Sequence, residues 1–71
     1  MSNSYEELAN AIIMQAVKDY RKILIRCKKY PHDKILTAQS KEIEKFFKSD
    51  WFVDLSDIDG TKIMKKLQEE L

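Results

Sequence analysis

The chain has 71 residues, of which 44% are hydrophobic and 35% are charged, with one glycine and one proline. It is too apolar for a disordered chain and too poor in turn-forming residues for a many-stranded β fold, and we expect a single domain over residues 1–71. Thirteen basic and twelve acidic residues leave a net charge of +1, which excludes a strong overall attraction to nucleic acid or anionic lipid.

No segment predicts export or membrane insertion. Met1 to Glu7 lack the basic and apolar runs of a signal peptide, and no apolar stretch reaches the roughly 18 residues of a membrane span. Cys27 is the only cysteine, so a disulfide within the chain is excluded. We therefore expect a cytoplasmic protein that has no membrane partner.

The first helix is predicted to begin at Ser4, which forms a capping box with Glu7. Pro31 lacks an amide donor and restricts the residue before it to extended geometry, so this helix should end near Lys29. Between these limits, apolar residues recur every three or four positions, as on one stripe of an amphipathic helix. They are Leu8, Ile12, Ile13, Ala16, Val17, Tyr20, Ile23, Leu24 and Cys27.

A second helix is predicted after Pro31, with Asp33 as its cap. A connection of about three or four residues between two helices forces them to run antiparallel, so the first and second helices should form a hairpin. The apolar residues of the second helix are Ile35, Leu36, Ile43, Phe46 and Phe47.

A short third helix and a longer last helix complete the predicted fold. Ser49 or Asp50 caps the short helix, and Asp57 or Asp59 caps the last one, which begins at about Thr61. The short helix carries Trp51, Phe52 and Leu55, and its aromatic face is expected to close the end of the hairpin. The last helix is expected to direct Ile63, Met64, Leu67 and Leu71 inward. The sequence thus predicts an all-α fold: a small bundle of three main helices with one additional short helix.

Three stretches of the chain resemble known sequences: AIIMQAVKDYRK, EIEKFFKSDWF and DIDGTKIMKKL. With them, the chain resembles a group of short uncharacterised helical proteins encoded by phages and integrative elements of Gram-positive bacteria. The second stretch is the most specific of the three. The resemblance implies a mobile-element protein that acts inside a bacterial cell, and it supplies no catalytic or binding residues. Small phage proteins often bind and redirect a host macromolecule.

No pattern in the sequence indicates catalysis or metal binding. His32 stands in a turn without a second histidine or cysteine at ligand spacing, and Cys27 lies on an apolar stripe, as expected of a buried, inert thiol. The stretch at 57–60, DIDG, resembles part of a calcium loop, but Lys66 stands where that loop needs a bidentate glutamate. We therefore expect no enzyme activity, no cofactor and no metal.

Aromatic residues gather between positions 46 and 52, and a short helix has too narrow a face to bury all of them. Exposed aromatic residues surrounded by charge are typical of binding hot spots. We predict a protein-binding surface formed by Phe47, Trp51 and Phe52 with Asp50 and Asp54. Its partner would be a host or mobile-element protein, or a second copy in a homodimer. The alternative is that the aromatic residues all fill the core of a small domain.

The same region is acidic, since Asp50, Asp54, Asp57 and Asp59 occur without a basic residue between them. Such a patch can imitate DNA phosphates or pair with the basic segment of a second copy. The simpler alternative is that these aspartates cap helices, where carboxylates accept unpaired amides.

A basic segment between Lys18 and Lys34, with a local excess of +5, supports an alternative hypothesis. A nucleic-acid-binding protein would use its exposed cations to contact phosphates. The candidate residues are Arg21, Lys22, Arg26, Lys28 and Lys29. No helix-turn-helix signature accompanies them, so a solvated basic face at a helix end is the favoured interpretation. A structural subunit that forms oligomers is a third hypothesis.

Overall fold

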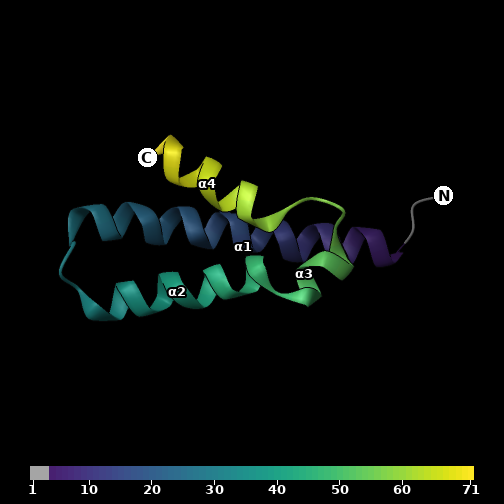
Figure 1. Ribbon diagram of the computed structural model, residues 1–71, viewed down its shortest axis with the longest axis horizontal. Coiled ribbons are helices and arrows are strands. Elements are labelled where there is room, and N and C mark those ends of the chain that lie inside the picture. The colour runs from purple at the N-terminus through teal and green to yellow at the C-terminus, as the bar shows by residue number, and fades with distance from the viewer. Residues whose placement is uncertain (1–3) are drawn as a thin grey trace.

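The computed structural model describes residues 4–71. They form four helices and no strand: α1 (Ser4–Lys29), α2 (Lys34–Lys48), α3 (Asp50–Leu55) and α4 (Gly60–Glu70). α1 and α2 run antiparallel as a hairpin, α3 turns back near the start of α1, and α4 packs along the hairpin (Figure 1). The described chain is therefore the predicted all-α bundle of three main helices and one short helix.

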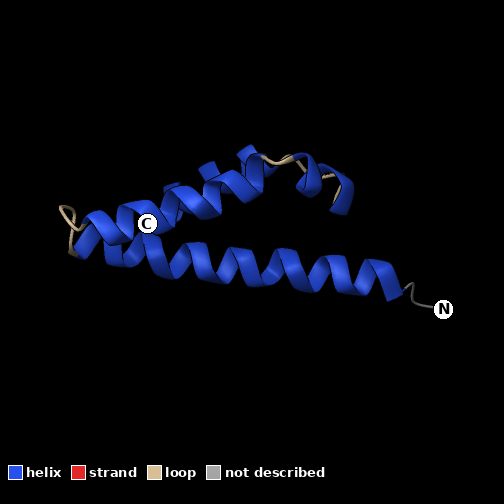
Figure 2. Ribbon diagram, turned by 90° about the horizontal axis from the view of Figure 1, so that it is seen from below, coloured by secondary structure: helices blue, strands red, loops and turns tan. Residues whose placement is uncertain are grey.

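α1 sets the shape of the molecule, which measures 46 × 20 × 20 Å. A helix of 26 residues is about 39 Å long at 1.5 Å per residue. In the view of Figure 2, α1 extends beyond the other helices toward its amino end. The first turns of α1 therefore have fewer neighbours than its middle.

Side-chain caps begin three of the helices at the predicted positions. A carboxylate oxygen of Asp33 accepts the backbone amide of Ile35 at 2.9 Å, and a carboxylate oxygen of Asp59 accepts that of Thr61 at 2.9 Å. Between them, the hydroxyl oxygen of Ser49 accepts the amide of the residue three positions later at 3.2 Å. Each cap pairs an amide that the helix itself leaves without an acceptor. These local interactions divide the chain into the predicted elements.

α1 has the boundaries that its sequence predicts. The helix begins at Ser4, so the residue predicted to cap the helix is its first residue. It ends at Lys29, two residues before Pro31, and Arg26, Lys28 and Lys29 lie in its last turn. Cations at that end interact favourably with the helix dipole.

The core lies between α4 and the α1–α2 hairpin. Its buried residues are Tyr20, Phe47, Phe52, Met64 and Leu67. Phe47 is at the centre of the aromatic part, with ring centroids 5.8 Å from Tyr20 and 5.6 Å from Phe52. These separations are typical of packed aromatic pairs. Burial of these large side chains provides the main free-energy gain on folding.

α4 begins in close contact with the end of α2. Gly60 is buried, and a Cβ atom at this position would clash with the backbone carbonyl oxygen of Phe47. The absence of a side chain at Gly60 therefore lets α4 pack directly against α2. This is the function of the single glycine in the chain.

A polar network joins the three main helices beside the core. The Tyr20 hydroxyl donates to Oε2 of Glu44 at 2.9 Å and accepts from Nε2 of Gln68 at 2.8 Å. Ser40 donates to the same Glu44 oxygen at 3.3 Å. Burial raises the pKa of Tyr20, and the neighbouring Glu44 carboxylate acts in the same direction, against the hydrogen bond from Gln68. Tyr20 thus stays a neutral donor that links α1 to α2 and α4.

Two predicted core residues, Leu8 and Ile35, are exposed by 61% and 71%, so the expectation that they face inward is wrong. Leu8 lies twelve positions before Tyr20, and Ile35 lies twelve positions before Phe47. Twelve residues correspond to three turns and about a third of a turn. Leu8 and Ile35 therefore lie about a third of a turn around their helices from Tyr20 and Phe47. Because α1 and α2 run in opposite directions, this rotation directs both side chains to the side of the hairpin away from α4.

Candidate functional site

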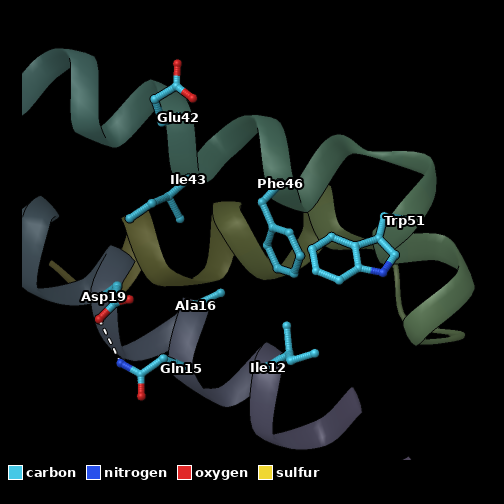
Figure 3. Close-up of a pocket in the computed structure, with 8 residues that line it drawn as sticks. All are labelled: Ile12, Gln15, Ala16, Asp19, Glu42, Ile43, Phe46 and Trp51. Carbon is cyan, nitrogen blue, oxygen red and sulfur yellow. Dashed lines mark hydrogen bonds between the residues drawn. The ribbon is translucent and has the colours of Figure 1, made fainter. Parts of the chain in front are cut away.

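An apolar groove lies between α1 and α2 on the side of the hairpin opposite α4. Figure 3 looks into this groove, with α1 and α2 forming its two walls and α4 behind it. The groove has a volume of about 410 Å³. Its lining residues are Ile12, Gln15, Ala16, Asp19, Glu42, Ile43, Phe46 and Trp51.

Trp51 closes one end of the groove. Its side chain is 55% exposed, and its ring meets that of Phe46 edge to face, with centroids 5.5 Å apart and an interplanar angle of 78°. Both rings point into the gap between α1 and α2 (Figure 3). A tryptophan in this position offers a large apolar surface that the described residues leave more than half uncovered.

Ser49 determines where Trp51 lies. Its hydroxyl donates to the carbonyl oxygen of Phe46 at 2.6 Å and accepts the amide of Phe52 at 3.2 Å. The same residue therefore ends α2 and begins α3. The sharp change of direction at Ser49 places two consecutive α3 residues on opposite sides: Phe52 enters the core, and Trp51 faces the groove.

The predicted protein-binding surface needs correction at two of its aromatic residues. Phe47 and Phe52 are 2% and 0% exposed and belong to the core, because α3 and α4 pack over them. Asp50 and Asp54 are exposed on α3 beside Trp51. Of the three aromatic residues predicted for a partner, the fold exposes Trp51 alone.

A second, smaller groove of about 260 Å³ continues the first toward the hairpin turn. The two share Asp19 and Ile43. The continuation is also lined by Lys22, Ile23, Arg26 and Gln39. The seam between α1 and α2 is thus apolar near Trp51, acidic in its middle at Asp19 and Glu42 (Figure 3), and basic near the turn.

The five predicted nucleic-acid contacts do not form one face. Lys22 and Arg26 lie along the seam, whereas the Arg21 guanidinium points toward α4, where it pairs with Glu70 at 3.2 Å. Lys28 and Lys29 are exposed near the end of α1, and Lys29 Nζ lies 5.6 Å from the centre of the Tyr30 ring. A nucleic-acid duplex bound along the seam would therefore contact Arg21 only if the ion pair between Arg21 and Glu70 broke.

The described residues place the remaining candidates away from any shared site. His32 is exposed in the turn, Cys27 is half-buried in α1, and Asp59 caps α4. Among residues 4–71, no group of three histidine, cysteine or acidic side chains lies close enough to hold a metal ion. None of the helices in this part of the chain is long and apolar enough to cross a lipid bilayer.

Sequence reasoning missed the groove although it identified most of its apolar residues. Ile12, Ala16, Ile43 and Phe46 were all expected in the core, and Gln15, Asp19 and Glu42 had no predicted role. The available signal was the width of the two apolar stripes, because Leu8 and Ile35 extend each stripe beyond what one neighbouring helix can cover.

Comparisons of the chain with protein-family models, with curated proteins and with solved structures give no match.

Proposed function

We propose that the chain is a non-enzymatic protein-binding module of a phage or mobile element, and that the groove containing Trp51 is its binding surface. The main support is the exposed Trp51 side chain at the end of an apolar groove. Tryptophan is among the residues most enriched in binding hot spots, and an exposed apolar surface with a polar border is typical of interaction sites.

The lining of the groove indicates what a partner would present. Ile12, Ala16, Ile43 and Phe46 provide apolar contact, while Asp19 and Glu42 lie in the two opposite walls. An apolar surface with basic residues at its borders would cover such a groove and complement its charges. The resemblance to mobile-element proteins suggests that a host or mobile-element protein supplies that surface.

Photocrosslinking from position 51 tests this proposal. We would replace Trp51 with p-benzoylphenylalanine, express the chain in Gram-positive bacterial cells and identify covalent adducts by mass spectrometry. Val53 is the matched control, because it is exposed on the same short helix but outside the groove. We expect protein adducts from position 51 and none from position 53. An absence of protein adducts at position 51 would contradict the proposal.

A nucleic-acid-binding function is the second candidate, because Lys22 and Arg26 lie together in the seam and Lys28 and Lys29 are exposed at the same end. Phosphate contacts make affinity fall steeply with salt. Titration of the chain with duplex and single-stranded DNA at about 50 mM salt tests this function. No binding at that salt concentration would exclude it.

A further inference from the structure

The two ends of the molecule carry opposite charges. Residues 4–11 and 49–59 lie together at one end (Figure 1) and contain six acidic and no basic residues. The Tyr5 hydroxyl joins these segments by donating to the backbone carbonyl oxygen of Asp54 at 3.4 Å. Residues 21–34 surround the hairpin turn at the opposite end and contain six basic residues and one acidic residue, Asp33.

Exposed apolar residues occur at both of these ends. They include Leu8 and Trp51 at the acidic end and Tyr30 and Ile35 at the basic end. Tyr30 lies eighteen positions after Ile12, which is five helical turns, and its amide continues the helical ladder to the Arg26 carbonyl at 2.8 Å. The helical register therefore places Tyr30 on the groove side.

Ile35 lies on the same side by the same reasoning. It precedes Phe46, which lines the groove, by eleven positions, or about three turns. The groove thus has an exposed apolar pair at each end, with acidic residues around one pair and basic residues around the other.

We propose that the groove is covered by the groove of a second copy of this chain, packed antiparallel about a twofold axis. The inference rests on the proposed function, since it takes the groove as a protein-binding surface and names its occupant. An antiparallel pair places the acidic end of each copy over the basic end of the other. A parallel pair would place like charges together, which is unfavourable. A twofold interface uses the same surface on both copies.

The register follows from the ends of the seam. Ile12 and Arg26 mark those ends on α1, so the twofold axis passes near Asp19, midway between them. Leu8 of each copy then lies opposite Tyr30 of the other, because both are eleven positions from Asp19.

The same register covers α2. Within one copy, Ile12 of α1 lies beside Trp51, and Ile23 lies beside Gln39. Rotation about the axis near Asp19 therefore places Trp51 of one copy opposite the region of Ile35 in the other. Asp19 and Glu42 approach the axis from both copies. Lys22 lines the seam one turn after Asp19, so the antiparallel arrangement brings this cation near the Asp19 carboxylate of the other copy. Lys45 pairs with Glu42 of its own copy, with Nζ and Oε1 3.4 Å apart.

Disulfide exchange between two cysteine variants tests the arrangement. Both variants carry Cys27→Ala, and one adds Leu8→Cys while the other adds Tyr30→Cys. In a thiol–disulfide buffer at micromolar concentration, we expect the mixed disulfide to predominate over either symmetric one. Two Leu8 positions would be about 33 Å apart along the helix axes, since 22 residues at 1.5 Å separate them. Predominance of the Leu8→Cys symmetric disulfide would overturn the antiparallel arrangement.

Sedimentation equilibrium of the unmodified chain tests whether the pair forms. We expect twice the mass of one chain, which is 8.4 kDa. Asp50→Lys with Asp54→Lys changes the net charge of the acidic end from −6 to −2, and Arg26→Glu with Lys29→Glu changes that of the basic end from +5 to +1. Each double variant should dimerise about tenfold more weakly at low salt, and an equimolar mixture should recover the mass of a pair.

Two outcomes would overturn the inference. The first is a single-chain mass at every concentration, and the second is a dimer that charge reversal does not affect. Neither outcome contradicts the proposed function if position 51 still crosslinks to a different polypeptide. If position 51 gives no protein adduct, the proposed function fails as well, so the two failures can be distinguished.

Discussion

The two sides of the α1–α2 hairpin have similar residues and different surroundings. On the side that α4 covers, Tyr20 and Phe47 are buried. On the opposite side, Ile12, Phe46 and Trp51 line an open groove. Among residues 4–71, α3 covers only the end of that groove and no helix runs along it. The apolar stripes of α1 and α2 are thus wider than one neighbouring helix can cover. The part that packs against α4 forms the core, and the rest remains an exposed surface on which a partner can bind.

The two sides should differ most in the free energy of unfolding that is lost when Phe52 or its neighbour Trp51 is replaced. Phe52→Ala removes a fully buried ring that packs against Phe46 and Phe47 at 5.6 Å, and we expect a loss of about 3–5 kcal/mol in the free energy of unfolding. Urea denaturation measures this loss, with all variants at one chain concentration because a dimer gains stability with concentration.

Trp51→Ala is the matched control for that prediction. Its side chain is partly exposed and contacts Phe46 at one edge, so the expected loss for an isolated chain is about 1 kcal/mol or less. Equal losses for the two variants would contradict the assignment of Phe52 to the core and Trp51 to the open side.

A smaller loss is expected where α4 meets the hairpin. Gly60→Ala introduces a Cβ atom against the Phe47 carbonyl, and we expect it to cost about 1–3 kcal/mol. The direction is informative because alanine is otherwise favoured over glycine in a helix by about 1 kcal/mol. Thr61→Ala, at the next and exposed position, is the control. A more stable Gly60→Ala variant would show that α4 does not start against α2.

Tyr20→Phe should have an effect of about 1 kcal/mol. It keeps the buried ring and removes the hydroxyl that joins Glu44 to Gln68. Thermal unfolding at neutral pH measures the difference. An unchanged melting temperature would mean that this network does not help hold α4 on its side of the hairpin.

The pH dependence of stability provides the finest test of that network. Burial, together with Glu44, raises the pKa of Tyr20 in the folded chain above its value of about 10 in the unfolded chain. The resulting contribution to stability is complete below pH of about 10 and is lost as the pH rises through the folded pKa. The unmodified chain should therefore lose more stability than Tyr20→Phe between pH about 9 and 11. Parallel pH profiles would contradict this account.

The sequence was sufficient for the secondary structure because the signals are local. Asp33, Ser49 and Asp59 cap the helices that they precede, and Pro31 follows the end of α1. Helical periodicity likewise placed Tyr20, Met64 and Leu67 in the core. Each of these features depends on residues within a few positions of one another.

The candidate site depends on interactions between distant elements, so the sequence identified it only in part. Phe47, Trp51 and Phe52 are all large aromatic residues in one short stretch, and only the turn at Ser49 and the packing of α4 decide which of them is exposed. Leu8 and Ile35 fit the apolar stripes as well as the buried residues do. Their exposure follows from the side on which α4 packs, which helical periodicity does not specify.

The fluorescence of Trp51 tests the central claim most directly, because it is the only tryptophan in the chain and it lies on the open side of the hairpin. As the chain concentration rises from nanomolar to millimolar, the account predicts that its emission maximum moves to shorter wavelength while the sedimenting mass doubles. A pair that forms while the emission stays that of a solvent-exposed tryptophan would contradict the claim that this groove is the surface through which the chain binds.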